Sequence, residues 1–341
     1  MATQKMKAWR LHQFGIEHLH LDDIAIPQPG PNDLLIRVNA VSINYRDKAI
    51  VDGVYNPDIL EKGPITLASD ASGTVVALGT DVTRFREGDK VITQVYTRWL
   101  DGERTPDDPD YLLGSPLAGV LSEYIVINEA AAVAKPEYLT DEEAATLPIA
   151  ALTAWNAITT VGNIRKGQTI FIQGTGGVAL FSVQIAAALD AKVIISTSQD
   201  EKGIKAMSLG AHHFINYHTQ PDWELEVLKL TGGTGADEIV ELVAGDITRS
   251  VKAIKFGGTI AIIGFLDHPQ LTVNVFSLFA KQPNIVGLSI GHRRSFEEMN
   301  AFFEQHQIRP MIDGVYDFAN AAEAFRHLSK GPFGKIVIKI S

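Results

Sequence analysis

The chain has 341 residues, of which 45% are hydrophobic and 21% charged, so it can bury a large core and has room for two domains. Its formal net charge of −10 argues against nucleic acid or an anionic membrane as the main partner, although a local basic pocket could still bind a phosphate. The absence of cysteine excludes disulfides and thiolate metal sites and fits a reducing cytoplasm. The N-terminus has no apolar signal core and no apolar run is long enough to cross a bilayer, so a soluble cytoplasmic protein is expected.

The first part of the chain, residues 1–128, is predicted to be a β-rich domain. Its apolar segments alternate or are β-branched, and proline and glycine separate them. These segments are residues 34–44, 71–79, 88–95 and 122–128. The pattern predicts a compact, antiparallel, barrel-like domain.

From residue 129 to 291 strands alternate with helices. A helical stretch over 142–158, interrupted by Pro148, comes first. Six apolar strands follow, with helices between them that include 178–191 and 200–210. The strands are 169–173, 192–197, 212–216, 238–243, 258–264 and 284–290. Continuous β-branched strands separated by helices predict an α/β domain with a doubly wound parallel sheet.

The tail of the chain, from about residue 292, is expected to return to the first domain. It contains two predicted helices, over 295–305 and 319–328, and a final strand over 335–340.

A glycine-rich loop follows the first strand of the parallel sheet and opens a helix. Its GxGxxA form is a permitted variant of the dinucleotide fingerprint: Gly174 allows a tight turn, Gly176 lets the backbone approach a pyrophosphate, and Ala179 lets the helix pack closely. The helix N-terminus would present free N–H groups to the phosphates. Glycines here can also serve packing alone, but this context predicts a bound dinucleotide. The loop residues expected to contact it are Gly174, Thr175, Gly176, Gly177 and Val178.

The end of the next strand distinguishes NAD from NADP. An acidic residue there usually binds the ribose hydroxyls of NAD, but this strand ends in Thr197 and Ser198, with Lys202 one turn later. Two hydroxyls and a lysine can receive a 2′-phosphate, so NADP(H) is favoured. Alternatively, Ser198 and Glu201 form a capping box and Lys202 is a solvated surface charge.

With these motifs the chain resembles the medium-chain dehydrogenase/reductase superfamily, in its zinc-independent, quinone oxidoreductase-like and alcohol dehydrogenase-like branch. The segments that carry the resemblance are 42–55, 73–91, 144–158, 173–186, 209–217 and 334–338. The resemblance implies a GroES-like catalytic domain over 1–128, completed by 292–341, and a Rossmann NADP(H)-binding domain over 129–291. It also implies an active site in the cleft between them, and a homodimer paired through the strand over 284–290.

The zinc ligands of related enzymes are missing here. The matching positions are Asn44, Ser69 and Ile149, and an amide, a hydroxyl and a hydrocarbon cannot make a zinc site. The stretch that matches the structural zinc lobe, 94–121, has neither Cys nor His. His18 and His20 would share a strand face without a third ligand, so no metal is expected.

Without a metal, hydrogen-bond donors must polarise a substrate carbonyl. By resemblance, Asn44 borders the nicotinamide and could donate to a substrate oxygen or orient the cofactor, and Tyr55 could protonate the product. Asp47 is the third candidate catalytic residue, although a structural salt bridge between Arg46 and Asp47 is favoured. The plain alternatives are a backbone cap for Asn44 and ordinary packing for Tyr55.

Other cofactor contacts are implied by the resemblance alone. The matching positions are Asn44, Thr153, Lys202, Tyr217, Val243, Gly264, Phe265, Leu266, Arg293, Gly334 and Lys335. Each also has a structural explanation as a turn glycine, a core side chain or a solvated base.

Two reactions fit this branch: reduction of a quinone or of the C=C bond of an α,β-unsaturated carbonyl, and reversible conversion of alcohols and carbonyls. The absence of zinc ligands favours the first, in which hydride from the nicotinamide attacks the β carbon and a developing enolate oxygen needs a donor. The small-molecule substrate pocket is expected between the loops over 96–115 and 266–269, with Trp99, Tyr111, Phe265 and Leu266 as apolar walls.

Two alternative functions, neither of them that of an oxidoreductase, remain open. A GxSxG segment over 287–291 would make Ser289 the nucleophile of an esterase, followed by Asp313 and His327. A protein that binds NADPH without catalysis is also compatible with this fold.

Overall fold

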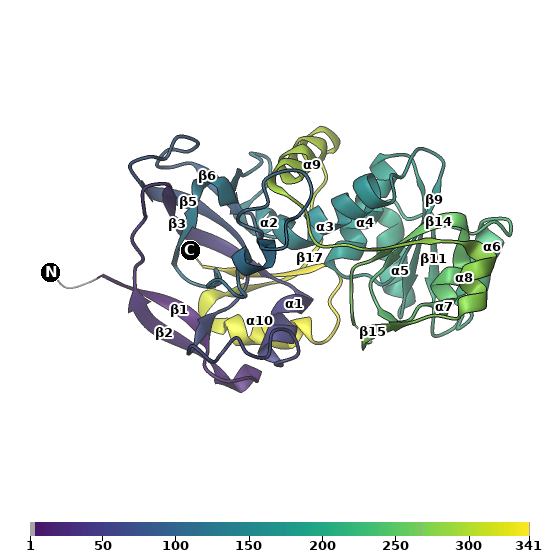
Figure 1. The fold of residues 1–341 in the computed structure, drawn as a ribbon, viewed down its shortest axis with the longest axis horizontal. Helices are drawn as coiled ribbons and strands as arrows, with labels where there is room; N and C mark the ends of the chain where they lie inside the picture. The colour runs from purple at the N-terminus through teal and green to yellow at the C-terminus, as the bar shows by residue number, and fades with distance from the viewer. Residues whose placement is uncertain (1–3, 267, 341) are drawn as a thin grey trace. The chain divides into compact units, whose positions relative to one another are not determined.

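The computed structural model describes residues 4–266 and 268–340 (Figure 1). The chain divides into two compact units: unit 1 comprises Met1–Leu152 and Gly291–Ser341, and unit 2 comprises Thr153–Ile290. Residues 129–152, which sequence reasoning assigned to the second domain, lie in unit 1. The reason is local packing: strand β8 (Ala132–Ala134) pairs with β6 (Lys90–Thr93), and helix α2 (Asp141–Ala144) packs on β3 (Asp33–Ile43).

Unit 1 is built on a seven-stranded sheet in the order β17-β18-β3-β5-β6-β8, with β7 also paired to β3. The strands not yet located are β5 (Asp70–Leu78), β7 (Tyr124–Asn128), β17 (Ile312–Asp317) and β18 (Lys335–Lys339). All pairs are antiparallel except β17 with β18. A second sheet has the order β2-β1-β4, with β1 (Lys5–Leu11), β2 (Leu19–Ala25) and β4 (Ile65–Thr66).

The core of unit 1 draws on both ends of the chain. Leu34, Ile36 and Val38 point inward at alternate positions of β3, as its alternating sequence predicts. Phe325 and Ile338 of the tail are buried in the same core. The tail therefore completes unit 1, and β18 pairs directly with β3.

Helices complete unit 1. They are α1 (Tyr45–Val51), α2, α9 (Arg293–His306) and α10 (Ala321–Leu328), with short 3₁₀ turns at Ile16–His18, Asp108–Tyr111, Glu129–Ala131 and Phe318–Asn320. The predicted helix over 142–158 is interrupted near Pro148 as expected. It continues as a π-helical turn Leu147–Ala151, helix α3 (Leu152–Asn156) and a second π-helical turn Ala157–Val161. The division between the two units falls inside α3.

Unit 2 contains a six-stranded, all-parallel sheet in the order β11-β10-β9-β12-β14-β16. Counted along unit 2 this is 3-2-1-4-5-6, the order of the doubly wound dinucleotide-binding fold. Its strands are β9 (Thr169–Ile172), β10 (Lys192–Thr197), β11 (His213–Asn216), β12 (Ala236–Glu241), β14 (Ile254–Ile262) and β16 (Asn284–Gly287). All six predicted strands are present, β10 with the predicted bounds and the other five with shifted ends, and the predicted fold class is confirmed.

Helices pack against this sheet (Figure 1). They are α4 (Gly177–Ala188), α5 (Asp200–Ser208), α6 (Trp223–Leu230), α7 (Thr248–Ala253) and α8 (Val275–Lys281). A short parallel pair, β13 (Ala244–Asp246) and β15 (His268–Thr272), lies outside the main sheet. The apolar strand residues Phe171, Ile194 and Ile239 form the centre of the core. Within the described ranges, no helix has both the length and the apolar character needed to cross a membrane.

Candidate functional site

The glycine loop of unit 2 joins the end of β9 to the start of α4. Gly174 has a φ of 75°, a conformation that strongly favours glycine, and Gly176 is the N-cap of α4 without a capping side chain. Side chains added at either position would meet no described atom within 4 Å. Packing within unit 2 therefore does not require a glycine at either position, and the first N–H groups of α4, which have no partner inside the helix, are suited to a phosphate.

A buried polar network holds the base of this loop. Gln173 Nε2 donates to Glu241 Oε2 (2.8 Å), while the backbone N–H of Leu242 donates to Gln173 Oε1 (3.1 Å). Glu241 Oε1 also accepts from the N–H groups of Val243 (3.2 Å) and Ala244 (3.1 Å). Burial raises the pKa of the Glu241 carboxyl, although these hydrogen bonds oppose the shift. The network ties the end of β9 to the end of β12.

Sequence reasoning missed both Gln173 and Glu241. The available signal was a polar residue at the carboxyl end of each of two neighbouring buried strands, where ligands bind in open α/β sheets.

The end of β10 lies beside the glycine loop. The N–H of Gly174 donates to Ser196 Oγ (3.3 Å), and Thr197 is buried. The backbone of Tyr217 donates to Thr197 O (3.0 Å), so the structure brings these two predicted cofactor residues together at neighbouring strand ends. The Tyr217 side chain is exposed.

The predicted capping box of Ser198 and Glu201 is wrong. Helix α5 begins at Asp200 with Gln199 as its N-cap and without a side-chain capping bond. Thr197 Oγ1 accepts from the N–H of Gln199, the N-cap residue (3.3 Å). The hydroxyl of Ser198 is therefore not used as a cap, and Lys202 lies in the first turn of α5.

The remaining cofactor positions predicted in unit 2 lie directly after strands or, in one case, in helix α3. Val243 follows β12, while Gly264, Phe265 and Leu266 follow β14, and the strands are parallel, so both groups lie at the same edge of the sheet as Gly174. A side chain on Gly264 would lie 1.9 Å from Leu242 O, so close packing explains this glycine without a ligand. Thr153 is buried in α3.

In unit 1 the start of α1 holds the candidate catalytic residues. Asn44 is the N-cap, and its backbone N–H donates to Asp47 Oδ2 (2.7 Å), which closes a capping box. Asp47 is fully buried, and burial raises the pKa of its carboxyl to about 6 although the Arg46 charge opposes the shift. Asp47 thus shapes the turn that presents Asn44.

Lys335 of β18 lies buried against this turn. Its ammonium donates to Ile43 O (2.9 Å) and to Asn44 Oδ1. Burial lowers the pKa of Lys335, and the charges of Asp70 and Asp47 oppose that shift. The Asn44 side-chain nitrogen has no hydrogen-bond partner of ordinary geometry among the described residues, although Asn44 lies close enough to Asp70 to lower the pKa of that carboxyl.

Asp70 interacts with the three positions that the resemblance predicts to match zinc ligands. It accepts from Ser69 Oγ (3.0 Å) and from the backbone N–H of Ile149 (3.1 Å), and burial raises its pKa while the Lys335 charge lowers it. The residues there remain an amide, a hydroxyl and a hydrocarbon, which do not fit zinc. No group of three or more His, Cys, Asp or Glu in the described ranges could hold a metal ion.

Arg46 does not form the predicted salt bridge with Asp47. Its guanidinium instead donates to Leu113 O (3.0 Å) and Ser115 O (2.9 Å) and lies 5.3 Å from the centre of the Tyr55 ring. The carboxylate of Asp47 is committed to the N-terminus of α1, so the two neighbouring side chains point to different partners.

Tyr55 lines a cavity of about 470 Å³ in unit 1. The other lining residues are Asn56, Tyr96, Arg104, Pro109, Asp110, Leu112, Ser115 and Pro116. Six of the nine lining residues belong to the loop over 96–115, which is predicted to border the substrate. Trp99 and Tyr111 do not line it: Trp99 packs on Tyr96 and Tyr111 lies under Arg98.

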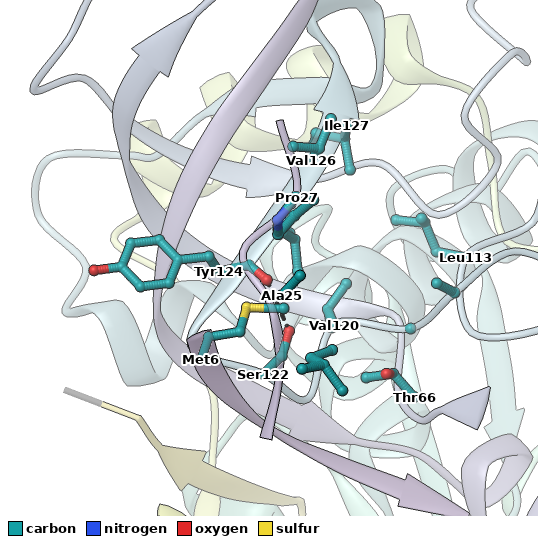
Figure 2. Close-up of a pocket in the computed structure, with 14 residues that line it drawn as sticks. Met6, Ala25, Pro27, Thr66, Leu113, Val120, Ser122, Tyr124, Val126 and Ile127 are labelled. Carbon is teal, nitrogen blue, oxygen red and sulfur yellow. Dashed lines mark hydrogen bonds between the residues drawn. The ribbon is translucent and has the colours of Figure 1, made fainter. Parts of the chain in front are cut away.

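A second, more apolar cavity of unit 1 has a volume of about 220 Å³ (Figure 2). Its walls include Met6, Ala25, Val120 and Ile127, which come from β1, β2, the segment before β7 and β7 itself. The candidate catalytic residues do not line it.

Two cofactor positions predicted in the tail have internal roles. Arg293 donates to Ala130 O (3.3 Å) and lies 3.6 Å from Glu297. Gly334 has a φ of 97°, and a side chain there would lie 2.2 Å from Met311 O. Backbone geometry therefore explains Gly334.

The geometry does not support an esterase. Ser289 lies in the connection over 288–292 between β16 and α9, and an esterase would need a histidine with a ring nitrogen available to this serine. Both ring nitrogens of His327 are engaged within unit 1, Nδ1 by Tyr316 (3.0 Å) and Nε2 by Asp313 (3.0 Å).

Comparison with known families gives two matches along the chain. Residues 30–137 match the alcohol dehydrogenase GroES-like domain, and residues 177–305 match the zinc-binding dehydrogenase family.

Individual relatives align over nearly their whole length. A zinc-type alcohol dehydrogenase-like protein of Schizosaccharomyces pombe is 35% identical over 96% of both chains. The quinone oxidoreductase of Homo sapiens is 28% identical over 99% of both. The crystal structure of a candidate alcohol dehydrogenase from Sinorhizobium meliloti 1021 is 42% identical over 100% of both chains, with a TM-score of 0.91.

Proposed function

The chain belongs to the medium-chain dehydrogenase/reductase superfamily and is an oxidoreductase; on that premise we propose that it uses NADPH to reduce a quinone or an α,β-unsaturated carbonyl without a metal ion. The observation that carries the proposal is the open glycine loop at the N-terminus of α4. Unit 2 would hold the cofactor and unit 1 the substrate, and we also propose a cytoplasmic location.

The cofactor proposal rests on the carboxyl edge of the unit 2 sheet. Gly174 and Gly176 leave space for a diphosphate, and Gln173 with Glu241 fixes the loop. Thr197 and Ser198 stand where an NAD enzyme usually has an acid. The nearby carboxylate of Asp200 is bound by Asn216 Nδ2 (2.6 Å), which leaves it less able to bind ribose hydroxyls.

The metal-free part of the proposal rests on the donor set around Asp70. Asn44, Ser69 and Ile149 supply no thiolate, imidazole or carboxylate of their own. One relative is named a zinc-type enzyme, but that name describes the relative. Equimolar zinc in the purified protein, measured by atomic emission, would overturn this part.

The chemistry of unit 1 would then depend on hydrogen bonds. Bound NADPH supplies a hydride. Asn44 Nδ2, a buried donor without a hydrogen bond of ordinary geometry among the described residues, would stabilise negative charge on the substrate oxygen. Tyr55 lines the pocket with an exchangeable proton on its hydroxyl and would protonate the reduced product.

A second candidate reaction is conversion between alcohols and carbonyls by the same residues. Relatives named as alcohol dehydrogenases favour it, while those named as quinone oxidoreductases and an acryloyl-coenzyme A reductase favour the first. A non-catalytic NADPH-binding protein is the remaining alternative from another class.

We propose a homodimer formed through β16. This strand is an edge of the unit 2 sheet, and its residues Ile285 and Val286 are exposed. Phe276 and Phe279 of α8 expose 79% and 69% of their surface. Apolar surface of this kind suits a self-complementary interface.

A cofactor and acceptor screen tests the proposal. NADPH oxidation is followed at 340 nm with quinones, enones, aldehydes and ketones, with NADH in parallel. Turnover of quinones or enones with NADPH supports the proposal, and a preference for NADH of about tenfold, roughly 1.4 kcal/mol, contradicts the cofactor assignment. Tight NADPH binding without turnover of any acceptor would favour the non-catalytic alternative.

A further inference from the structure

Lys335 is a buried cation whose hydrogen bonds are directed inside unit 1. Only 4% of its surface is exposed, and its ammonium donates to Ile43 O (2.9 Å) and Asn44 Oδ1. The resemblance assigned Lys335 to cofactor binding. An ammonium committed to two oxygens of the same unit is better suited to fixing the group that it contacts.

The contact with Lys335 decides which way the Asn44 carboxamide points. An ammonium can only donate, so Asn44 must present its oxygen to it. The nitrogen then occupies the opposite side of the carboxamide as a donor. Asn44 is 7% exposed, and its Nδ2 has no hydrogen bond of ordinary geometry within the described part of the chain, although Asn44 lies close enough to the Asp70 carboxyl to lower its pKa. A buried donor held in this way is suited to an acceptor supplied by a ligand.

Two further contacts make this arrangement rigid. The Asn44 backbone N–H is held by Asp47 Oδ2 (2.7 Å), so the start of α1 cannot rotate freely. Burial lowers the pKa of Lys335, and the carboxylates of Asp70 and Asp47 oppose that shift by attracting its positive charge. Ile43 O can only accept, so it too requires a donor at Lys335.

We propose that Lys335 is a positioning residue that orients the Asn44 carboxamide so that Nδ2 donates a hydrogen bond to the carbonyl oxygen of the substrate. The identity of the acceptor rests on the proposed function, whereas the orientation rests only on unit 1. In this arrangement Asn44 Nδ2 is already oriented before the substrate binds. Negative charge that develops on the substrate carbonyl oxygen is then stabilised by a fixed N–H group.

The first experiment tests the orientation without turnover. The full-length protein is labelled with ¹⁵N-asparagine, and the Asn44 side-chain signal is assigned from its loss in Asn44→Asp. In Lys335→Met we expect the two Nδ2 proton shifts of Asn44 to move, because the carboxamide loses its fixed partner. Unchanged shifts in a folded Lys335→Met protein would overturn the positioning role, whether or not any acceptor is reduced.

The matched control is Lys339→Met on the same strand, β18. The Lys339 side chain is 52% exposed and lies 3.5 Å from Glu142, so its loss should leave the Asn44 signal unchanged. If Lys335→Met fails to fold because two buried carboxylates lose their cation, the double variant Lys335→Met/Asp70→Asn reduces that imbalance. The same shift of the Asn44 signal is expected in the double variant.

The second experiment separates positioning from cofactor binding. Lys335→Met should lower kcat by about 100- to 1000-fold, as for loss of one oxyanion donor, with the Kd for NADPH unchanged by fluorescence titration. Asn44→Asp keeps an acceptor for Lys335 but removes the donor, so it should lose as much activity. The double variant Lys335→Met/Asn44→Asp should lose little more activity than either single variant. A weaker NADPH affinity with normal kcat at saturation would instead identify Lys335 as a cofactor ligand.

The two experiments keep the proposals apart. If the wild-type protein reduces no acceptor, the proposed function fails and the NMR signal still decides the role of Lys335. If the wild type is active but Lys335→Met behaves as the wild type in both experiments, only the positioning role fails.

Discussion

Glu238 is a carboxylic acid buried in the sheet of unit 2 without a partner. Neither carboxyl oxygen has a hydrogen bond among the described residues, and burial raises the pKa of Glu238 well above its ordinary value of 4.5. The carboxyl occupies the space beside Gly162, where an added Cβ would lie 1.9 Å from Oε2. The folded protein therefore keeps Glu238 protonated at pH values at which the unfolded chain ionises it.

This difference predicts a pH-dependent effect of Glu238→Gln. Above pH 4.5 the unfolded state loses the proton first, so this group lowers the free energy of unfolding by about 1.4 kcal/mol per pH unit until the folded pKa is reached. The stability advantage of Glu238→Gln should thus grow with pH and be smallest at pH 4. Urea unfolding from pH 4 to 8 measures it, with the exposed Glu201→Gln as control. An advantage that is constant with pH would contradict the assignment.

Glu241, three residues along the same strand, is also a buried carboxyl group but, unlike Glu238, it accepts several hydrogen bonds. All of its recorded partners donate: Gln173, Ser250 and the N–H groups of Val243 and Ala244. Glu241→Gln would turn an NH₂ group toward one of these donors. We expect a loss of about 1–3 kcal/mol in the free energy of unfolding.

The same substitution should weaken NADPH binding because the glycine loop loses its support. Thermal unfolding and fluorescence titration measure the two effects, with Glu201→Gln again as control. Normal stability and affinity in Glu241→Gln would show that the network does not hold the loop.

At the scale of elements, the proposed preference for NADPH depends on the junction of β10 with α5. Ser198 lies after the strand and is not used as a helix cap, so its side chain is available to a ligand. Ser198→Asp places a carboxylate where NAD enzymes bind ribose and where it would repel a 2′-phosphate. We expect the Kd for NADPH to rise by about tenfold or more, while that for NADH falls.

Isothermal titration with both nucleotides measures this change. Ser208→Asp, at the other end of α5, is the matched control because Ser208 is exposed and far along the helix. An unchanged ratio of the two affinities would place the 2′-phosphate elsewhere.

The sequence predicted elements better than the contacts between them. Alternation in β3 and continuous apolar runs in β9 and β10 are local signals, and the structure contains these strands within one or two residues. The start of α5 at Asp200 was predicted correctly, but its cap was not: Ser198 and Glu201 match a capping box by spacing, whereas Gln199 is the N-cap and its N–H donates to Thr197 Oγ1.

Contacts between distant residues left no local pattern. Lys335 and Asn44 are 291 positions apart, and the separation of Gln173 from Glu241 is 68. The family resemblance identified Asn44 and Lys335 as functional positions but did not reveal that one holds the other. In the same way, the opposite charges of the neighbours Arg46 and Asp47 suggested an ion pair. The pair does not form because the Asp47 carboxylate accepts a hydrogen bond at the N-terminus of α1.

For the whole molecule, the exposed apolar surface of unit 2 predicts the oligomeric state. Phe276→Glu/Phe279→Glu introduces charges beside β16, and burying them in a dimer would be unfavourable. We expect the wild type to sediment as a dimer and the variant as a monomer at micromolar concentration. Leu225→Glu on α6, where Leu225 is 58% exposed, is the control. A variant that remains dimeric would place the interface on another surface.

The pairing of β3 with β18 has a consequence for synthesis on the ribosome. Residues 40–43 of β3 acquire Lys335–Lys339 as neighbours only after the rest of the polypeptide has been translated. The intervening unit 2 contains all the strands of its own sheet and can fold during elongation, while the β3 edge waits unpaired. Nascent chains that stall late in translation would thus contain a folded unit 2 and an incomplete unit 1. The unpaired edge of β3 in such chains is prone to pair with strands of other chains.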